Sequence, residues 1–165
     1  MDLQRIADTF EMLDDWEDRY SLLIDLGRKL PEFPASARNE ENRVEGCTSN
    51  VWLLTRVTDD QPPRIEFQAD SDAFIVKGLV AILLKAYSGK TAQEILDMDI
   101  ELLFNELGLA QQLTPNRRDG FVAMVKRMRA EEHEAQKRQR KAAGAGPGRP
   151  SKAVHSVSWV ALVAR

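Results

Sequence analysis

The sequence has little of three features that many functional sites require: cysteine, histidine and long apolar runs. Its 165 residues include one cysteine and two histidines, so the chain cannot close an internal disulfide or supply four ligands to a tetrahedral zinc site. No apolar run approaches the roughly 20 residues that cross a bilayer. The first residues, M-D-L-Q-R-I-A-D-T-F-E, contain no basic segment followed by an apolar one, so they are not a secretory signal. These absences predict a soluble, cytoplasmic protein with no membrane contact.

The charge is divided unevenly along the chain. Residues 131–165 hold seven basic and three acidic residues, whereas the other 130 hold 16 basic and 23 acidic residues. An acidic body repels phosphate backbones, which argues against nucleic acid as its partner. A nucleic-acid role would have to lie in residues 131–165, where G-R-P-S-K has a faint likeness to a basic minor-groove hook.

A change in composition predicts a domain boundary near Ala130. Residues 131–141 are almost all charged or polar, as expected for a solvated helix end or a disordered run. Residues 142–152 contain three glycines and two prolines, which do not favour regular structure. We expect one domain over residues 1–130, followed by a basic tail over 131–165 that is disordered.

The body begins and ends with helical patterns. Apolar residues at three- and four-residue steps predict a helix near residues 3–13, and a second helix starts after Asp15 and stops before Pro31. After Ser71, which is expected to cap a helix with a buried Phe74, the chain is helical to residue 130. Further helix starts are expected at the Thr91 and Glu94 capping box, at Asp99 and at Thr114-Pro115.

Between these helices the period changes to two. Residues 51–57 and 64–69 alternate in polarity and are rich in β-formers, with a turn at 59–63, so they predict an antiparallel pair. Residues 43–45 are the candidate third strand. The predicted fold class is α+β, with a small antiparallel three-stranded sheet packed by the N-terminal and C-terminal helices.

Cys47 is the candidate for covalent chemistry. The two histidines lie in or near the polar tail, which excludes a Ser-His-Asp arrangement in the body, and most carboxylates sit at helix starts, where capping explains them. Cys47 follows Gly46 at a predicted turn, although a lone cysteine is as often a small buried hydrophobe. Without a lysine or histidine beside it, an ordinary thiol is only about 3% thiolate at neutral pH, so Cys47 would need activation from elsewhere.

At these residues the chain resembles the SufE family, the sulfur acceptors that work with cysteine desulfurases in iron–sulfur cluster assembly. The likeness covers about residues 5–130 and rests on four blocks in the same order as in the family. They are D-W-E-D-R-Y-S-L-L-I-D-L-G-R-K-L-P (15–31), V-E-G-C-T-S-N-V-W (44–52), D-S-D-A-F-I-V-K-G-L (70–79) and L-T-P-N-R-R-D-G (113–120).

The resemblance implies that Cys47 accepts a persulfide sulfur from a desulfurase, stimulates that enzyme, and hands the sulfur to an iron–sulfur scaffold. It implies a carrier and activator rather than an enzyme, with no metal and no cofactor of its own, since pyridoxal phosphate resides on the partner desulfurase. A homodimer is left open. Cys47 is expected to be sheltered in the free protein and presented to the partner, because burial protects a persulfide from stray thiols and oxidants.

Three further residues carry over as supporting residues. Arg117 would position the cysteine loop or stabilise the thiolate, although a surface ion pair explains it equally well. Asp72 would lie near the cysteine loop or the partner surface, with a helix-start carboxylate as the alternative. Ser49 would donate to the sulfur, while the neighbouring Trp52 is expected to anchor its strand in the core.

Two departures from the family pattern and two competing functions remain. Position 48 is threonine where the family most often has glutamine, and residues 131–165 extend past the usual end of the family.

One alternative function is a self-sufficient thiol enzyme or redox sensor, which requires a depressed pKa of Cys47 and a basic group beside it. The other is a nucleic-acid binder that acts through the tail, with a structural Cys47.

Overall fold

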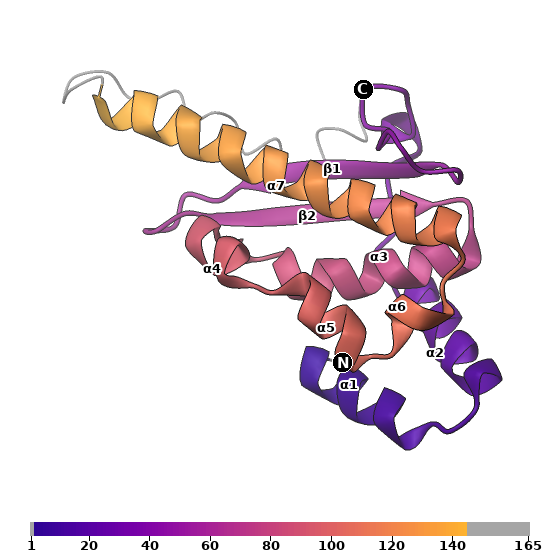
Figure 1. The fold of residues 1–165 in the computed structure, drawn as a ribbon. Helices are drawn as coiled ribbons and strands as arrows, with labels where there is room; N and C mark the ends of the chain where they lie inside the picture. Colours follow the sequence, from indigo (N-terminus) through magenta and orange to yellow (C-terminus); the bar gives the residue numbers. More distant parts are fainter. Residues whose placement is uncertain (1, 145–165) are drawn as a thin grey trace.

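The computed structural model describes residues 2–144, and its fold is α+β as predicted (Figure 1). Within these residues, helices α1 and α2 precede two long strands, α3 lies between these strands and a short third one, and four further helices follow. The elements are α1 (Leu3–Met12), α2 (Trp16–Arg28), the 3₁₀ turn η1 (Ala35–Ala37), β1 (Val51–Val57), β2 (Arg64–Ser71), α3 (Phe74–Tyr87), β3 (Lys90–Thr91), α4 (Ala92–Asp97), α5 (Ile100–Glu106), α6 (Leu109–Gln112) and α7 (Pro115–Gly144).

The sheet has the order β1-β2-β3 and is antiparallel throughout, but its third strand is not the predicted one. Residues 43–45 form only an isolated bridge between Arg43 and Trp52. The chain leaves the sheet there because Gly46 turns it with a φ of +90°. The third strand is β3, which returns to the edge of β2 after a turn at Gly89, where φ is +77°.

Several predicted helix starts are confirmed. Asp15 caps α2 by accepting from the backbone of Glu17, and Thr91 and Glu94 form the predicted capping box of α4. Asp99 caps α5 in the same way. These caps satisfy backbone N–H groups that have no partner within their own helix.

The start of α3 differs from the prediction. Ser71 is the last residue of β2 rather than a helix cap, and its hydroxyl joins the backbone of Ala73 to that of Asn50. Phe74, expected to be buried, begins α3 and is 69% exposed. The buried face of α3 instead starts at Gly78, because the helix turns its first residue away from the core.

One large core joins the helices to one face of the sheet. Helix α3 lies at its centre, packed between α2 and β2, and Figure 1 shows α3 and α7 running alongside the long strands. A smaller cluster of Phe33, Ala37 and Leu54 covers the other face, and the partly buried Trp52 packs against it. Trp52 therefore anchors β1 through this second cluster rather than through the main core.

Helix α7 passes through the expected domain boundary at Ala130 and continues to Gly144. Its buried residues keep a helical spacing beyond that point, since Glu132 and Ala135 follow Met128 on the same face. Residues 131–144 are thus helical, which agrees with the helix end expected as one alternative for residues 131–141, while 145–165 lie outside the described residues. Within residues 2–144, no helix combines the length and apolarity needed to span a membrane.

Candidate functional site

The cysteine loop, residues 45–49, lies where β1 begins and approaches the start of α7. Gly46 makes this approach possible in two ways. Its φ of +90° is a conformation that L side chains rarely adopt, and a Cβ there would come within 3.2 Å of Ala123 Cβ on α7. The glycine expected before Cys47 therefore serves both the turn and the packing against α7.

Asn50 fastens the end of this loop to the end of β2. Its backbone N–H and side-chain amide donate to the two carboxylate oxygens of Asp72, over 3.1 and 2.8 Å. Its carbonyl accepts from the Ser71 hydroxyl over 2.8 Å and from the Asp72 backbone over 3.3 Å. The Arg43 guanidinium donates to the Asn50 side chain over 3.4 Å. We call this set of contacts around Asn50 the loop clamp.

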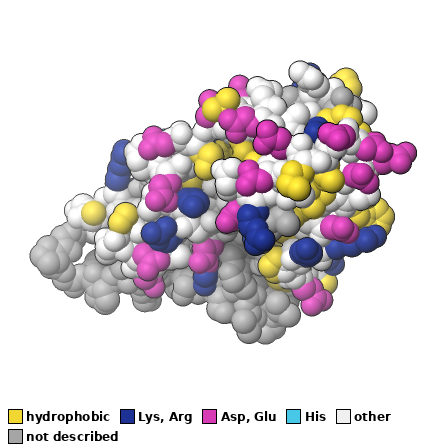
Figure 2. All heavy atoms as spheres, turned by 90° about the horizontal axis from the view of Figure 1, so that it is seen from below, with side chains coloured by type: hydrophobic (Ala, Val, Ile, Leu, Met, Phe, Trp, Pro, Cys, Tyr) yellow, Lys and Arg dark blue, Asp and Glu magenta, His cyan; other side chains and the backbone are white. Residues whose placement is uncertain are grey.

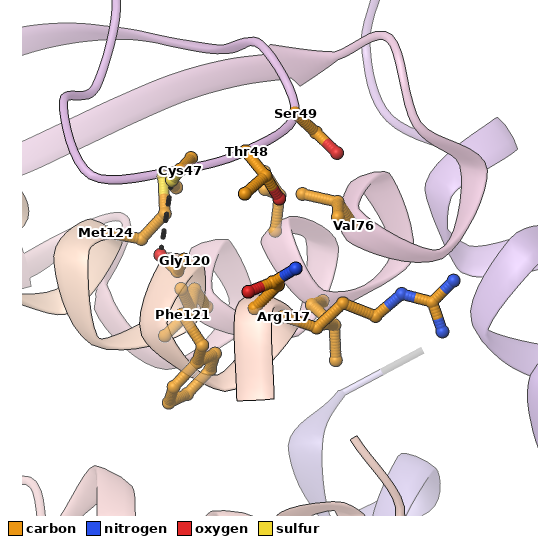
Figure 3. Close-up of a pocket in the computed structure, with 12 residues that line it drawn as sticks. Cys47, Thr48, Ser49, Val76, Arg117, Gly120, Phe121 and Met124 are labelled. Carbon is orange, nitrogen blue, oxygen red and sulfur yellow. Dashed lines mark hydrogen bonds between the residues drawn. The ribbon is translucent and has the colours of Figure 1, made fainter. Parts of the chain in front are cut away.

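Cys47 is partly buried against the first turns of α7, and its thiol donates to the carbonyl of Gly120 over 3.4 Å (Figure 3). A cavity of about 20 Å³ lies beside it. The cavity lining comes from the cysteine loop, α3 and α7, and most of it is apolar: Cys47, Thr48, Ser49, Val76, Leu79, Val80, Leu83, Asn116, Arg117, Gly120, Phe121 and Met124. This volume is about that needed to hold one water molecule.

Burial raises the pKa of the Cys47 thiol above its ordinary value, because a desolvated thiolate is disfavoured, while the Arg43 guanidinium partly offsets this effect. The free protein therefore holds Cys47 mainly as a neutral thiol at pH 7. A self-sufficient thiol enzyme or redox sensor needs a depressed pKa. The direction of the shift is the opposite of what that alternative requires.

This shift predicts the pH dependence of alkylation. Because the thiolate is the reactive form, the rate of Cys47 alkylation by iodoacetamide should rise with pH, with a midpoint above that of free cysteine at about 8.5. The measurement is the pseudo-first-order rate between about pH 6 and about pH 10, with the urea-unfolded chain as the control. A midpoint at or below the control value would contradict the desolvated environment.

The loop clamp predicts the effect of substituting Asp72. Asp72→Ala removes both acceptors of Asn50 and should favour an undocked loop by about 1 kcal/mol, which corresponds to about a fivefold faster alkylation of Cys47. Asp59→Ala is the matched control, since it removes the same charge from the exposed β1–β2 turn. Equal alkylation rates in the two variants would show that the clamp does not hold the loop.

The predicted supporting residues do not all surround the sulfur. Asp72 lies at the loop clamp and contacts Asn50 rather than Cys47. Ser49 lines the cavity, but Figure 3 shows it on the far side of Thr48 from Cys47, and the thiol donates to Gly120 instead. Arg117 also lines the cavity, with its guanidinium pointing away from Cys47. In the described part of the chain, that guanidinium forms no hydrogen bond or ion pair.

Sequence reasoning missed three residues of the site. Arg43 lies four positions before Cys47, and only the turn at Gly46 brings its charge close to the sulfur. Asn50 stands in the V-E-G-C-T-S-N-V-W block, so its position was visible, but its partners on β2 were not. Gly120 is the last residue of the L-T-P-N-R-R-D-G block. A glycine inside a predicted helix was the available signal that another segment, here Cys47, lies close to α7.

Comparison of the sequence with known proteins identifies its family. The family described as SufE, Fe-S metabolism associated domain, matches residues 4–132. The chain belongs to the SufE family. A SufE-like protein of Rhizobium etli is 49% identical over 130 residues, which cover 78% of this chain and 88% of that protein. A SufE-like protein of Rhizobium meliloti is 46% identical over 130 residues, covering 78% of this chain and 93% of the relative.

The fold is also similar to a solved structure. The solution structure of a hypothetical protein from Thermus thermophilus aligns with a TM-score of 0.65 and 22% identity, covering 82% of this chain and 96% of that one. At this identity the likeness concerns the fold alone. The SufE membership connects the chain to Fe–S metabolism, and the predicted resemblance to that family is confirmed.

Proposed function

We propose that this SufE-family protein is a sulfur carrier that takes a persulfide sulfur from a cysteine desulfurase onto Cys47. The observation that carries the proposal is the position of the one cysteine, at a loop tip beside a small apolar cavity. A sheltered neutral thiol suits a carrier that reacts only when a partner engages the loop. The fraction of reactive thiolate is small, so oxidants and other thiols in solution react with Cys47 slowly. The connection of the family to Fe–S metabolism agrees with this use of sulfur.

The transfer is a thiol exchange. The Cys47 thiol first loses its proton, and the thiolate attacks the outer sulfur of the persulfide on the desulfurase cysteine. A new S–S bond forms at Cys47 while the S–S bond on the desulfurase breaks, and the desulfurase cysteine leaves as a thiolate that takes up a proton. No net oxidant or reductant is required. Removing the sulfur regenerates the desulfurase cysteine, which is how the carrier would stimulate turnover.

The Cys47 persulfide would then pass its outer sulfur to a scaffold that assembles iron–sulfur clusters. Pyridoxal phosphate would remain on the desulfurase, and this chain would need no cofactor for its own step. In residues 2–144, no three His, Cys, Asp or Glu side chains gather closely enough to hold a metal ion. The thiol exchange uses none.

Nucleic acid binding through the tail remains the weaker alternative. Four of the seven basic residues on which it depends lie on α7, where Lys137 forms an ion pair with Glu134. On the face shown in Figure 2, acidic side chains are interspersed with basic ones, so the described part of that face presents no continuous basic patch. Interspersed charges do not make the basic stripe typical of phosphate binding.

Intact-mass spectrometry tests the proposal directly. The protein is incubated with cysteine and a purified desulfurase without reductant, beside a sample whose single cysteine has been alkylated beforehand. We expect a gain of about 32 Da, one sulfur atom, on the untreated protein only. No gain with any desulfurase of the same cell, while the thiol still reacts with iodoacetamide, would refute the carrier function.

Arg117 is proposed to act on the sulfur transfer through its charge. Arg117 lines the cavity, while its guanidinium points away from Cys47 and is unpaired in the described part of the chain. The guanidinium is therefore available to a thiolate or a carboxylate that the partner brings. Loss of one charge-assisted hydrogen bond predicts a roughly tenfold slower sulfur uptake in Arg117→Ala. Alkylation of the free protein should not change, because the guanidinium points away from Cys47.

The control for this variant is Arg118→Ala, which removes the same charge from the adjacent exposed position. Arg117→Lys should restore part of the rate, since lysine keeps the charge but not the planar donor geometry. Equal uptake rates for the alanine variants at 117 and 118 would assign Arg117 no part in the transfer.

A further inference from the structure

The space beside Cys47 depends on a glycine that the rest of the fold does not require. Gly120 lies inside α7, where glycine costs roughly 1 kcal/mol relative to alanine. Its backbone is not in the left-handed region, since the positive φ values belong to Gly46, Gly89 and Gly108 among the described glycines. The helix itself therefore gives no reason for a glycine at this position.

Packing of the thiol does not require the glycine either. A Cβ added at Gly120 would lie 3.5 Å from Cys47 Sγ, 3.8 Å from its Cβ and 3.9 Å from its Cα. These are ordinary van der Waals distances, so an alanine would fit against the thiol form without moving the cysteine loop. Such a methyl group would, however, occupy space beside the sulfur.

A persulfide needs that space. The outer sulfur of a persulfide lies about 2.0 Å from Sγ, whereas the added methyl group would sit 3.5 Å from the same atom. The outer sulfur and the methyl group of an alanine at position 120 cannot both lie on the α7 side of Sγ, because carbon and sulfur atoms that are not bonded stay well over 3 Å apart. The cavity beside Cys47, at about 20 Å³, has room for little more than one atom of this size.

We propose that Gly120 is a positioning residue that keeps room beside Cys47 for a second sulfur atom, so that the loop can stay docked on α7 while it carries a persulfide. This inference rests on the proposed carrier function. The carbonyl of Gly120 fits the same assignment, since it accepts the hydrogen of the thiol before loading. The missing Cβ then leaves the adjoining volume free for the sulfur that replaces that hydrogen.

The test compares Gly120→Ala with the wild type after loading by inorganic polysulfide, without a desulfurase. The Cys47 thiolate attacks a polysulfide sulfur, one S–S bond breaks, and the shortened polysulfide leaves. Excess glutathione is then added, and the loss of about 32 Da is followed by intact mass. We expect the Gly120→Ala persulfide to disappear about tenfold faster, because its outer sulfur is displaced towards solvent.

Two further readouts separate this effect from a general loosening of the loop. Alkylation of the unloaded Gly120→Ala protein should stay within about twofold of the wild type, and its melting temperature should be equal or higher. Asp119→Ala is the matched control, since it also raises helix propensity on α7 at an exposed position, and it should lose the persulfide at the wild-type rate.

Either of two results would overturn the assignment. One is a persulfide on Gly120→Ala that lasts as long as in the wild type, and the other is alkylation that accelerates in parallel with persulfide loss. Because loading uses polysulfide, these results do not depend on whether a desulfurase delivers sulfur to Cys47. A failure of the carrier function would appear instead in the desulfurase experiment with the wild type.

Discussion

Cys47→Ser should abolish the stimulation of the desulfurase, reducing cysteine turnover to the rate of the desulfurase alone. The serine hydroxyl cannot form the S–S bond on which the transfer depends, and the chain has no other cysteine to replace it. The measurement is alanine and sulfide formation from cysteine, with the carrier in excess. The expected loss is complete rather than partial, since a single atom receives the sulfur.

The variant also provides its own structural control. A serine hydroxyl can donate to the Gly120 carbonyl as the thiol does, so the free energy of unfolding should change by no more than about 1 kcal/mol. Binding to the desulfurase should be retained. Full stimulation by a stably folded Cys47→Ser protein would mean that the chain activates its partner by contact alone and does not carry the sulfur.

Gly78→Ala should be the most destabilising single methyl addition among the glycines of the described chain. Gly78 lies where α3 crosses α2, and a Cβ there would come within 2.2 Å of the Leu23 carbonyl oxygen and 2.6 Å of its carbon. Real Cβ atoms do not approach so closely, and the atoms in the way are backbone, so α2 must shift. We expect a loss of about 3 kcal/mol and a fall in melting temperature of about 10 °C.

Gly144→Ala is the control for this substitution, because a Cβ there meets nothing within 4 Å. It should leave the melting temperature nearly unchanged, since a surface change away from packing contacts has little effect on stability. Thermal unfolding followed by circular dichroism measures both variants. A Gly78→Ala protein as stable as Gly144→Ala would show that α2 and α3 do not pack as closely as their backbones indicate.

Local signals in the sequence predicted most of the helices and the two long strands, but not the third strand or the contacts around Cys47. The capping residues Asp15, Thr91 and Asp99 act within one turn of their own helices, so their roles could be predicted from short-range patterns alone. The alternation in residues 51–57 gave β1 for the same reason.

Pairing across the fold depends on contacts between distant residues. The predicted antiparallel pair of residues 51–57 and 64–69 is confirmed, but the predicted third strand was wrong. Two segments lie close enough to the sheet to form its third strand: residues 43–45 and Lys90–Thr91. The turns at Gly46 and Gly89 decided the outcome, since they direct one segment away from the sheet and the other back to its edge. The burial of Glu132 and Ala135 also depends on packing, since composition alone does not show that α7 stays packed beyond residue 130.

The sequence by itself determined the α+β class, the family and the one cysteine that the proposed function uses, because these depend on residue types and short spacings. Only the tertiary structure decided the surroundings of that residue. It brought Gly120 and Arg43 to the thiol, linked Asp72 to the loop through Asn50, and left the guanidinium of Arg117 pointing away from the sulfur. These relations join segments up to 73 residues apart, and they arise from packing in three dimensions, which no local period in the sequence records.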